Sequence, residues 1–349
     1  MVSIKQINYA LAVEKEMHFK NAADKCFVSA STLSNAISEM EKQLGFEIFE
    51  RNNKKVIVTK LGEEILKKYK SIKLQLEDIQ KISENNSQPL SHPISLGVIP
   101  TISPFLMPYA IKSLSTKFPK LNLNISEGQS NDLIDKVKNG DLDMAILALP
   151  FKLQGLIPIK FWAEDFFWIT KKNDARSKDN EIKANELDRS ELLLLEEGHC
   201  LKDHILSACK MTKQASNISF KASSLNTLIQ FVKSGMGTTL VPRMAISQLM
   251  AGNPDLKNLH LDESGPHREI AIVIRPNYGG IQDVELLGAE LKKILEENLR
   301  QKEQKNQLLI KGLEKVKNQI ENLKLLIKSK VGDDNKVFGS VNSATIEKS

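Results

Sequence analysis

Apolar residues over the first 45 positions recur every three or four residues, which is the period of one face of an α-helix. Three such stretches predict three short helices. Ser29 stands where the N-cap of the third helix is expected, and Gly45 follows its last turn, as a left-handed residue would. Short apolar runs then flank a basic turn at 51–55 and predict a two-stranded wing. The pattern over residues 1–60 is typical of an α+β winged helix-turn-helix domain.

A second helical pattern covers residues 61–90. Its apolar members are spaced by three or four positions, as in a coiled-coil seam: Leu61, Ile65, Tyr69, Ile72, Leu76 and Ile79. The seam predicts a linker helix that pairs two copies of the chain. Polar residues and two prolines at 83–93 then predict a hinge before the next domain.

Strand and helix patterns alternate from residue 91 to residue 299, which predicts an α/β domain with parallel sheets. The expected strands are 94–99, 121–126, 143–148, 166–170, 192–196, 238–241 and 270–274. The expected helices are 104–117, 130–138, 202–210, 224–234 and 283–298. The chain fits lobe I at about 91–163 and 269–299 and lobe II at about 164–268, with a ligand cleft between them. Thr101 and Ser130 would place hydroxyl groups at this cleft, or would serve only as helix caps.

Residues 300–349 carry a different pattern. A short heptad seam, with lysines on the other faces, runs through Leu309, Leu313, Val316, Ile320, Leu323 and Ile327. The polar stretch 331–349 is expected to be disordered. Packing on the body of the protein, further oligomerisation and added DNA affinity all remain open for this Lys-rich amphipathic extension.

Composition places the chain among ordinary globular proteins. Its 349 residues suit about two domains, and 41% of them are hydrophobic and 26% charged. No apolar run has the length of a membrane helix, and the N-terminal pattern is not that of a secretory signal. Three cysteines do not make a disulfide framework, so a cytoplasmic location is expected. No motif calls for a metal or an organic cofactor.

The net charge of +6 is unevenly distributed. Residues 1–89 carry +2, residues 90–299 carry −1 and residues 300–349 carry +5. Within 51–73, eight basic residues outweigh two acidic ones, which favours an anionic partner such as DNA. A solvated helix face is the alternative explanation.

The third helix would enter the major groove of double-stranded DNA as a recognition helix. Its polar candidates for base contacts are Ser31, Thr32, Ser34, Asn35 and Ser38. The candidates in the wing for phosphate or minor-groove contacts are Arg51, Lys54 and Lys55. A generic three-helix bundle, in which serine and threonine only cap helices, is the alternative.

Residues 196–209, EEGHCLKDHILSAC, hold two cysteines nine positions apart. Cys200 follows a predicted strand and a glycine at the start of a helical pattern, beside His199 and near Lys202. A helix N-terminus and nearby cations stabilise a thiolate, which is the form that peroxide oxidises to a sulfenic acid. Neighbouring acidic residues oppose this effect. A small buried hydrophobe is the alternative role for each cysteine.

The spacing of the two cysteines adds a mechanical constraint. On an intact helix nine residues span ~13 Å, whereas a disulfide needs Cα atoms within ~7 Å of each other. The pair therefore cannot bridge while the segment between them stays helical. Closing this loop would reduce the entropy of the chain, which corresponds to a free energy of roughly 2.7 kcal/mol. Oxidation would thus select a second conformation of the lobe.

A specific set of positions in the N-terminal domain points to a family. The positions are Ala22-Ala23, Val28-Ser29, Thr32-Leu33-Ser34, Ile37, Glu41, Leu44-Gly45, Phe49-Glu50-Arg51 and Thr59-Lys60-Leu61-Gly62. They resemble the DNA-binding domain of LysR-type transcriptional regulators. Ala30-Ser31 stand where that family usually has Gln-Pro, so its operator preference does not carry over. The resemblance implies a dimerising linker helix, a pseudo-palindromic DNA site and a two-lobed, periplasmic-binding-protein-like regulatory domain.

Stretches of the second domain resemble the hydrogen-peroxide-sensing members of that family. They are 97–108, 118–121, 142–149, 197–203, 222–225 and Arg268. The resemblance implies that Cys200 is the peroxidatic thiol and Cys209 the resolving thiol. It implies a peroxide pocket lined by Thr101, Ser130, His199, Lys202, Asp203 and Arg268. Ser130 and Lys202 stand where the pattern has threonine and arginine. Cys26 is expected to belong to the core of the DNA-binding domain.

These observations together predict a homodimeric or homotetrameric DNA-binding activator that responds to hydrogen peroxide. It would act with RNA polymerase on oxidative-stress genes, and it would not be an enzyme. The alternative is a LysR-type regulator of a small organic effector bound in the cleft, with silent cysteines. A thiol peroxidase is a third class, and the DNA-binding domain argues against it.

Overall fold

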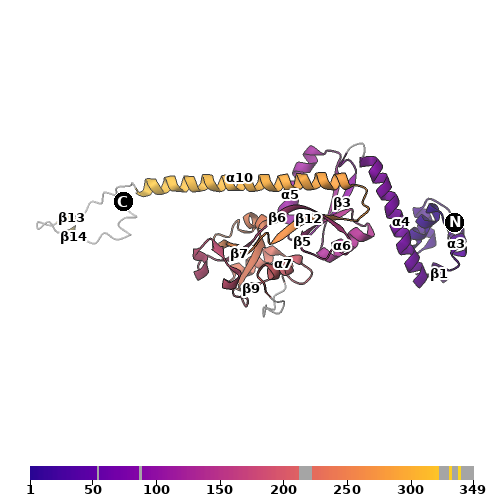
Figure 1. The fold of residues 1–349 in the computed structure, drawn as a ribbon, viewed down its shortest axis with the longest axis horizontal. Helices are drawn as coiled ribbons and strands as arrows, with labels where there is room; N and C mark the ends of the chain where they lie inside the picture. The colour runs from indigo at the N-terminus through magenta and orange to yellow at the C-terminus, as the bar shows by residue number, and fades with distance from the viewer. Residues whose placement is uncertain (53–54, 86–88, 212–221, 322–329, 332–336, 339–349) are drawn as a thin grey trace. The chain divides into compact units, whose positions relative to one another are not determined.

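The computed structural model of the chain describes residues 1–52, 55–85, 89–211, 222–321, 330–331 and 337–338. Residues 1–295 form one compact unit and residues 296–349 form another. The first unit contains an N-terminal helical domain, a linker helix and a two-lobed α/β domain (Figure 1). This architecture confirms the fold class that the sequence predicted.

The N-terminal domain consists of three helices and a hairpin. The helices are α1 (Ile4–Glu16), α2 (Phe19–Lys25) and α3 (Ala30–Leu44), and the antiparallel strands are β1 (Phe49–Asn52) and β2 (Lys55–Val58). Their apolar faces share one small core, against which the half-buried Cys26 packs. As predicted, Ser29 caps α3 by accepting a hydrogen bond from the Thr32 amide, and Gly45 ends the helix at a φ of 80°.

A buried carboxylate joins the hairpin to α3. Glu41 is only 9% exposed. Its Oε1 accepts hydrogen bonds from the amides of Ile48 (2.8 Å) and Phe49 (3.0 Å). Hydrogen bonds to an ionised acceptor are stronger than those between neutral groups. Glu41 therefore fixes the start of the wing relative to α3.

The linker helix is α4 (Lys60–Asn85). Its predicted apolar seam is interrupted, because Ile65 and Tyr69 pack against the core of the N-terminal domain. Leu61, Ile72 and Ile79 remain exposed, at 53%, 38% and 61%. These three residues are the part of the seam that the single chain leaves uncovered.

Lobe I is built on a five-stranded sheet with the order β4-β3-β5-β12-β6. Its strands are β3 (Pro93–Val98), β4 (Asn122–Glu127), β5 (Met144–Leu149), β6 (Ile157–Glu164) and β12 (Arg268–Ile274), and its first helices are α5 (Ser103–Lys117) and α6 (Ser130–Asn139). β3 pairs in parallel with β4 and β5, whereas β12 runs antiparallel to β5 and β6. The sheet is mixed, so the expectation of parallel sheets is wrong. β12 reverses direction because the chain re-enters lobe I from lobe II.

Lobe II has a second mixed sheet, with the order β8-β11-β7-β10-β9. Its strands are β7 (Phe166–Lys171), β8 (Glu181–Ile182), β9 (Leu192–Leu193), β10 (Thr238–Pro242) and β11 (Leu256–Leu261). Its helices are α7 (Cys200–Ala208), α8 (Leu225–Lys233) and α9 (Arg243–Leu249), with short 3₁₀ turns at Ala175–Lys178 and Ala184–Glu186. The chain crosses between the lobes from β6 to β7 and again from β11 to β12.

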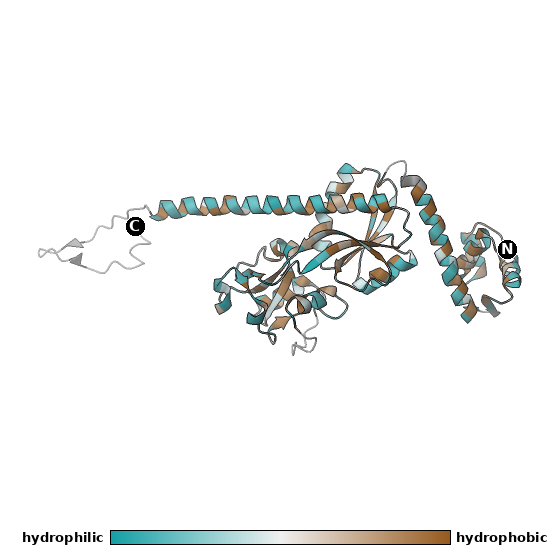
Figure 2. Cartoon of the chain, viewed as in Figure 1, coloured by the Kyte–Doolittle hydropathy of each residue, from teal (hydrophilic) through white to brown (hydrophobic). Residues whose placement is uncertain are grey.

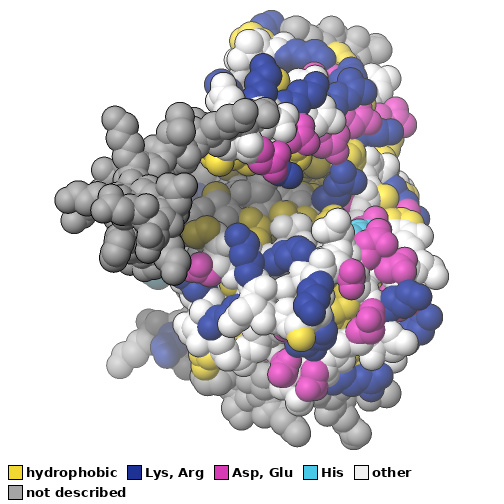
Figure 3. Space-filling model, turned by 90° about the vertical axis from the view of Figure 1, so that its left-hand side faces the viewer, with side chains coloured by type: hydrophobic (Ala, Val, Ile, Leu, Met, Phe, Trp, Pro, Cys, Tyr) yellow, Lys and Arg dark blue, Asp and Glu magenta, His cyan; other side chains and the backbone are white. Residues whose placement is uncertain are grey.

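A continuous apolar core extends through both lobes. Figure 2 shows hydrophobic residues on strands of both lobes, and β5 and β10 are buried at every position. Charges of both signs are interspersed over the face shown in Figure 3. None of the described helices has the length and apolar character needed to cross a lipid bilayer.

The last helix, α10 (Ile281–Glu321), is longer than expected, because the helix predicted at 283–298 and the heptad seam join in one element. Its first turns are buried, as at Leu287 and Leu291, but Leu309 and Leu313 are 56% and 67% exposed. β13 (Lys330–Val331) and β14 (Val337–Phe338) pair antiparallel, and all of their residues except Lys330 lie in the stretch expected to be disordered. The seam residues Leu323 and Ile327 lie outside the described residues.

Candidate functional site

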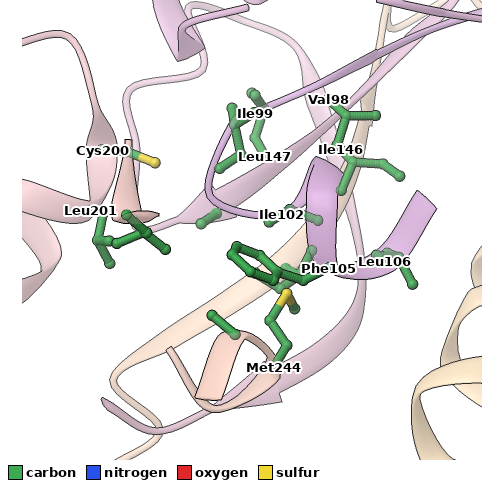
Figure 4. Close-up of a cluster of buried hydrophobic side chains, with 14 of the residues drawn as sticks. Val98, Ile99, Ile102, Phe105, Leu106, Ile146, Leu147, Cys200, Leu201 and Met244 are labelled. Carbon is green, nitrogen blue, oxygen red and sulfur yellow. The ribbon is translucent and has the colours of Figure 1, made fainter. Parts of the chain in front are cut away.

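The two cysteines of lobe II mark the ends of one helix. α7 begins at Cys200, and Cys209 is its C-cap residue. Both cysteines are free and buried, at 2% and 4% exposure. Figure 4 shows the Cys200 sulfur directed away from α7 toward Ile99 and Leu147 of lobe I. The Cys200 thiol therefore lies where the two lobes meet.

A buried ion pair forms the polar side of this site. Arg268, the first residue of β12, donates hydrogen bonds from Nε and Nη2 to Oε1 of Glu164 at 2.9 and 2.7 Å. Its Nη1 donates to Oγ1 of Thr101 at 3.2 Å. The second oxygen of Glu164 accepts the amide of Met244, near the start of α9, at 2.9 Å. Both charged side chains are 0% exposed. The guanidinium is held by Glu164 and Thr101 of lobe I, and Glu164 in turn is held by the Met244 amide of lobe II.

Two helices begin at the Cys200 sulfur. Ser130 is the first residue of α6, and Cys200 is the first residue of α7. Burial raises the pKa of the Cys200 thiol, while the Ser130 hydroxyl and the Arg268 charge lower it. The net direction is upward, because a site shielded from water penalises the charged form. The stabilised thiolate that the sequence suggested is therefore not the resting form.

The Ser130 hydroxyl is available for a further contact. It approaches the Cys200 thiol closely enough to lower its pKa. Its buried Oγ nevertheless makes no hydrogen bond of regular geometry within the described part of the chain. A hydroxyl can donate one hydrogen bond and accept two, so Ser130 could contact both the thiol and a small polar ligand beside it.

The other predicted pocket residues lie around the start of α7. His199 is the N-cap residue, and burial lowers the pKa of its ring, which is therefore neutral near pH 7. The half-buried Lys202 has its Nζ 3.7 Å from a carboxylate oxygen of Glu197. Asp203 is exposed. Lys202 and Asp203 thus lie nearer the surface than the group around Cys200.

Cys209 is held away from Cys200 by the whole of α7. Nine residues of helix rise ~13 Å, which exceeds the ~7 Å limit for disulfide formation. Burial, followed by the charge of Glu263, raises the pKa of the Cys209 thiol to about 12. A Cys200–Cys209 bridge would require α7 to unwind and Cys209 to leave its buried position.

Three residues outside the predicted set shape the site. Glu164 holds Arg268, and His204 of α7 contacts the backbone of lobe I at Pro150. Gln129, which precedes α6, packs so closely on Gly198 that a Cβ there would lie 2.1 Å from its Oε1. Gly198 in the sequence could have indicated that another segment approaches the backbone closely before His199. Nothing in the sequence distinguishes Glu164 from a surface carboxylate.

No cluster of three His, Cys, Asp or Glu side chains in the described ranges could hold a metal ion.

The predicted recognition residues occupy one end of α3. Ser31, Thr32 and Asn35 are exposed, whereas Ser34 and Ser38 are half-buried. Two of them also take part in capping, because Ser29 Oγ lies 2.9 Å from Ser31 Oγ and 2.7 Å from Thr32 Oγ1. Asn35, one turn further on, presents an amide that can both donate and accept hydrogen bonds.

The wing carries the predicted backbone contacts. Arg51 belongs to β1, and the exposed Lys55 begins β2 directly opposite Asn52. Lys54 lies outside the described residues. The described part of the wing thus places a basic side chain at the start of β2.

A winged helix-turn-helix domain, joined by one helix to a two-lobed domain with a buried polar site, defines a DNA-binding regulator with a sensory domain. The comparisons identify its family. The helix-turn-helix model of lysR-family bacterial regulatory proteins matches residues 4–63, and the LysR substrate binding domain model matches residues 87–294. The chain belongs to the LysR family of transcriptional regulators.

Relatives within this family are named as transcriptional regulators. The HTH-type transcriptional regulator EstR of Acinetobacter baylyi is 37% identical over 274 residues, which cover 78% of this chain and 90% of EstR. The DNA-binding transcriptional dual regulator OxyR of Escherichia coli is 30% identical over 280 residues, which cover 79% of this chain and 90% of OxyR. The predicted resemblance to peroxide-responsive members is thereby confirmed.

Solved structures of OxyR proteins share the fold. A full-length OxyR variant from Pseudomonas aeruginosa superposes with a TM-score of 0.68 at 29% identity, covering 84% of this chain and 98% of that chain. A hydrogen-peroxide-bound OxyR variant from Corynebacterium glutamicum gives a TM-score of 0.59 at 29% identity, covering 85% and 94%.

The C-terminal extension resembles a different protein family. The model of the C-terminal domain of ribosomal protein L9 matches residues 311–349, which follow the part matched by the LysR models.

Proposed function

We propose that this regulator senses hydrogen peroxide by oxidation of Cys200 and formation of a Cys200–Cys209 disulfide, and that the oxidised form activates oxidative-stress genes. One arrangement carries the proposal: two buried thiols at opposite ends of α7, the first beside a fixed arginine and a buried serine hydroxyl. Relatives named hydrogen peroxide-inducible genes activators support it, including the Haemophilus influenzae protein at 30% identity.

The chemistry of the first step follows from the groups around Cys200. Arg268 and Thr101 would hold one peroxide oxygen, and Ser130 would hold the other, because each can offer a hydrogen bond. The Cys200 sulfur gives up its proton and attacks one oxygen, so an S–O bond forms and the O–O bond breaks. The sulfur becomes a sulfenic acid, and the departing oxygen leaves as water.

The second step closes the disulfide. The Cys209 sulfur attacks the sulfenic sulfur, the S–S bond forms, and the hydroxyl group leaves as a second water molecule. Two thiols are oxidised and one peroxide is reduced to two water molecules. Because α7 separates the sulfurs, this step needs a new conformation of lobe II, which is the signal. The reaction is stoichiometric, so no enzymatic turnover is needed.

The readout would be on DNA. Two copies of the chain would present two α3 helices to a pseudo-palindromic site, with Ser31, Thr32 and Asn35 at the bases and Arg51 and Lys55 at the phosphates. Homodimers would assemble further into homotetramers and act with RNA polymerase in the cytoplasm.

The test treats the full chain with one equivalent of peroxide and maps the linked peptides while transcription is measured in vitro. The parent should form the Cys200–Cys209 linkage and activate, Cys200→Ser should do neither, and Cys209→Ser should stop at the sulfenic acid. Cys26→Ser is the matched control, and it should behave as the parent. Amide exchange across 201–208 should rise on oxidation. Activation without the linkage would overturn the proposal.

A second candidate is regulation by a small organic effector in the same inter-lobe site, with silent cysteines. The observation that favours it is the 37% identity to EstR, which exceeds the 30% identity to the Escherichia coli OxyR. The same experiment separates the two candidates. An organic effector would activate transcription without a Cys200–Cys209 linkage, and it would act equally on Cys200→Ser.

A further inference from the structure

One contact of α7 takes no part in the proposed redox chemistry. His204 is 1% exposed, and its Nε2 lies 2.8 Å from the carbonyl oxygen of Pro150, the residue that follows β5 in lobe I. A carbonyl can only accept a hydrogen bond, so Nε2 carries the proton and donates. Nδ1 is buried and has no hydrogen-bond partner among the described residues. The ring is therefore a neutral donor that reaches from lobe II to lobe I.

The surroundings of His204 oppose its protonation. Burial lowers the pKa of the ring to about 4. The hydrogen bond to Pro150 and the Asp203 charge on α7 itself act upward, and the Arg268 charge on β12 acts downward. A second proton on Nδ1 would be buried without an acceptor, which is the physical reason why the neutral ring persists in this site.

We propose that His204 is a positioning residue that fastens α7 to lobe I in the reduced state, so that release of α7 on oxidation takes up a proton. This inference rests on the proposed disulfide switch. His204 lies midway between the two cysteines, in the segment that must unwind before the sulfurs can meet. Unwinding would break its contact with Pro150 and expose the ring to water.

The coupling has a definite sign and size. In water the pKa of the ring returns to ~6.5, whereas it is about 4 in the fastened state. Between these values the released form binds a proton that the fastened form does not, so falling pH favours the released, oxidised form. Between pH 7.5 and pH 5.5 the equilibrium should shift about tenfold toward the disulfide.

The measurement is the equilibrium constant for exchange between the Cys200–Cys209 disulfide and dithiothreitol in the full chain, approached from both sides and trapped for mass spectrometry. At pH 5.5 and 7.5 all the thiols of reduced protein and reductant stay protonated, because their pKa values lie well above this range. The parent constant should therefore change about tenfold through His204, in addition to any change through His199, whose pKa burial also lowers.

Two variants separate positioning from titration. His204→Gln keeps an amide that can donate to Pro150 but does not titrate, so its constant should be equal at the two pH values within about twofold. His204→Leu loses both the donor and the proton, and its constant should be equally independent of pH. His199 at the start of α7 remains in both variants, so the tenfold change that they lose relative to the parent belongs to His204.

Several results would overturn the inference. These are a parent constant that does not change with pH, and a tenfold change that persists in His204→Gln. An NMR titration of the reduced chain supplies a readout independent of the disulfide: the ring should titrate near 4, and a midpoint near 6.5 would refute the fastened state. Absence of any Cys200–Cys209 linkage would remove the proposed function and this inference together.

Discussion

The buried pair of Glu164 and Arg268 allows a sharp test of how the site is held. Glu164→Gln keeps the shape of the side chain and removes its charge. Glu164 now satisfies both Arg268 and the Met244 amide, one with each oxygen, at 2.7 and 2.9 Å. Glutamine has only one oxygen, so one of these partners loses its acceptor, and the guanidinium stays buried without a counter-charge.

The expected cost follows from complete burial. Both side chains are 0% exposed, so water cannot solvate the orphaned charge. Removal of one partner of such a pair costs about 3–5 kcal/mol of unfolding free energy. With a urea slope of about 2–3 kcal/mol per molar, the unfolding midpoint should fall by roughly 1–2.5 M.

The chain contains its own probes for this assay. Trp168 of β7 is fully buried in lobe II, and Trp162 of β6 is half-buried in lobe I, so tryptophan fluorescence reports on both lobes. The control is Glu164→Gln combined with Arg268→Met, which removes both charges. The combined variant should be more stable than Glu164→Gln alone, with a coupling energy of about 2 kcal/mol or more.

A second readout links the pair to the chemistry. In Glu164→Gln the Arg268 charge is no longer neutralised, so it should lower the pKa of Cys200 further and speed alkylation of that thiol near pH 8. Cys209 should react as in the parent. The reasoning would be refuted by a loss below 1 kcal/mol together with unchanged Cys200 alkylation.

Three further predictions concern other parts of the molecule. Lys55→Ala should weaken binding to operator and random DNA alike and reduce the slope of log affinity against log salt by about one unit, whereas Asn35→Ala should change which DNA sequences bind best. Fluorescence anisotropy at several salt concentrations checks this, and identical behaviour of both variants would contradict it. Glu41→Gln should raise amide exchange at Ile48 and Phe49 by about tenfold, because the charged acceptor of both amides is lost, and an unchanged exchange rate would count against its role in holding the wing. Lowering the pH from 7.5 to 5 should cost the parent about 2 kcal/mol of unfolding free energy through His204, because the pKa of its ring is about 4 in the folded chain and ~6.5 in the unfolded chain, which therefore binds the proton first. Urea unfolding of His204→Gln should lack this loss.

The sequence predicted the parts of the fold in which local pattern and burial agree. β5 is buried at every position and reads as a continuous apolar run, so its strand was predicted within one residue of its bounds. β6 was missed, because its alternating exposure is broken by Pro158 and Lys160 and it pairs with β12 alone at the edge of the sheet. Edge strands give the weakest signals in sequence.

The residues of the candidate site also differ in whether the sequence could predict them. The start of α7 at Cys200 could be predicted, because a glycine and a change of period mark it locally. Glu164 could not be predicted, since it meets Arg268 across 104 positions of sequence and its burial depends on both crossings between the lobes. The upward pKa of Cys200 was missed for a related reason: local charge is readable in a sequence, but desolvation is a property of the folded site.

The fixed and movable halves of the site come from different lobes, and this division bears on how a small oxidant could act as a switch. Thr101, Glu164 and Arg268 are joined by hydrogen bonds across the ends of three lobe I strands, and they need not move when a sulfur is oxidised. α7 and its C-cap residue carry both cysteines and His204, so the bond proposed to form and the contact proposed to break belong to one short segment, 200–209. A rearrangement confined to that segment would leave Thr101, Glu164 and Arg268 in place for the next reduced cycle. Variants of the lobe I groups should therefore change the rate of Cys200 oxidation, while variants of His204 should change the equilibrium of the switch.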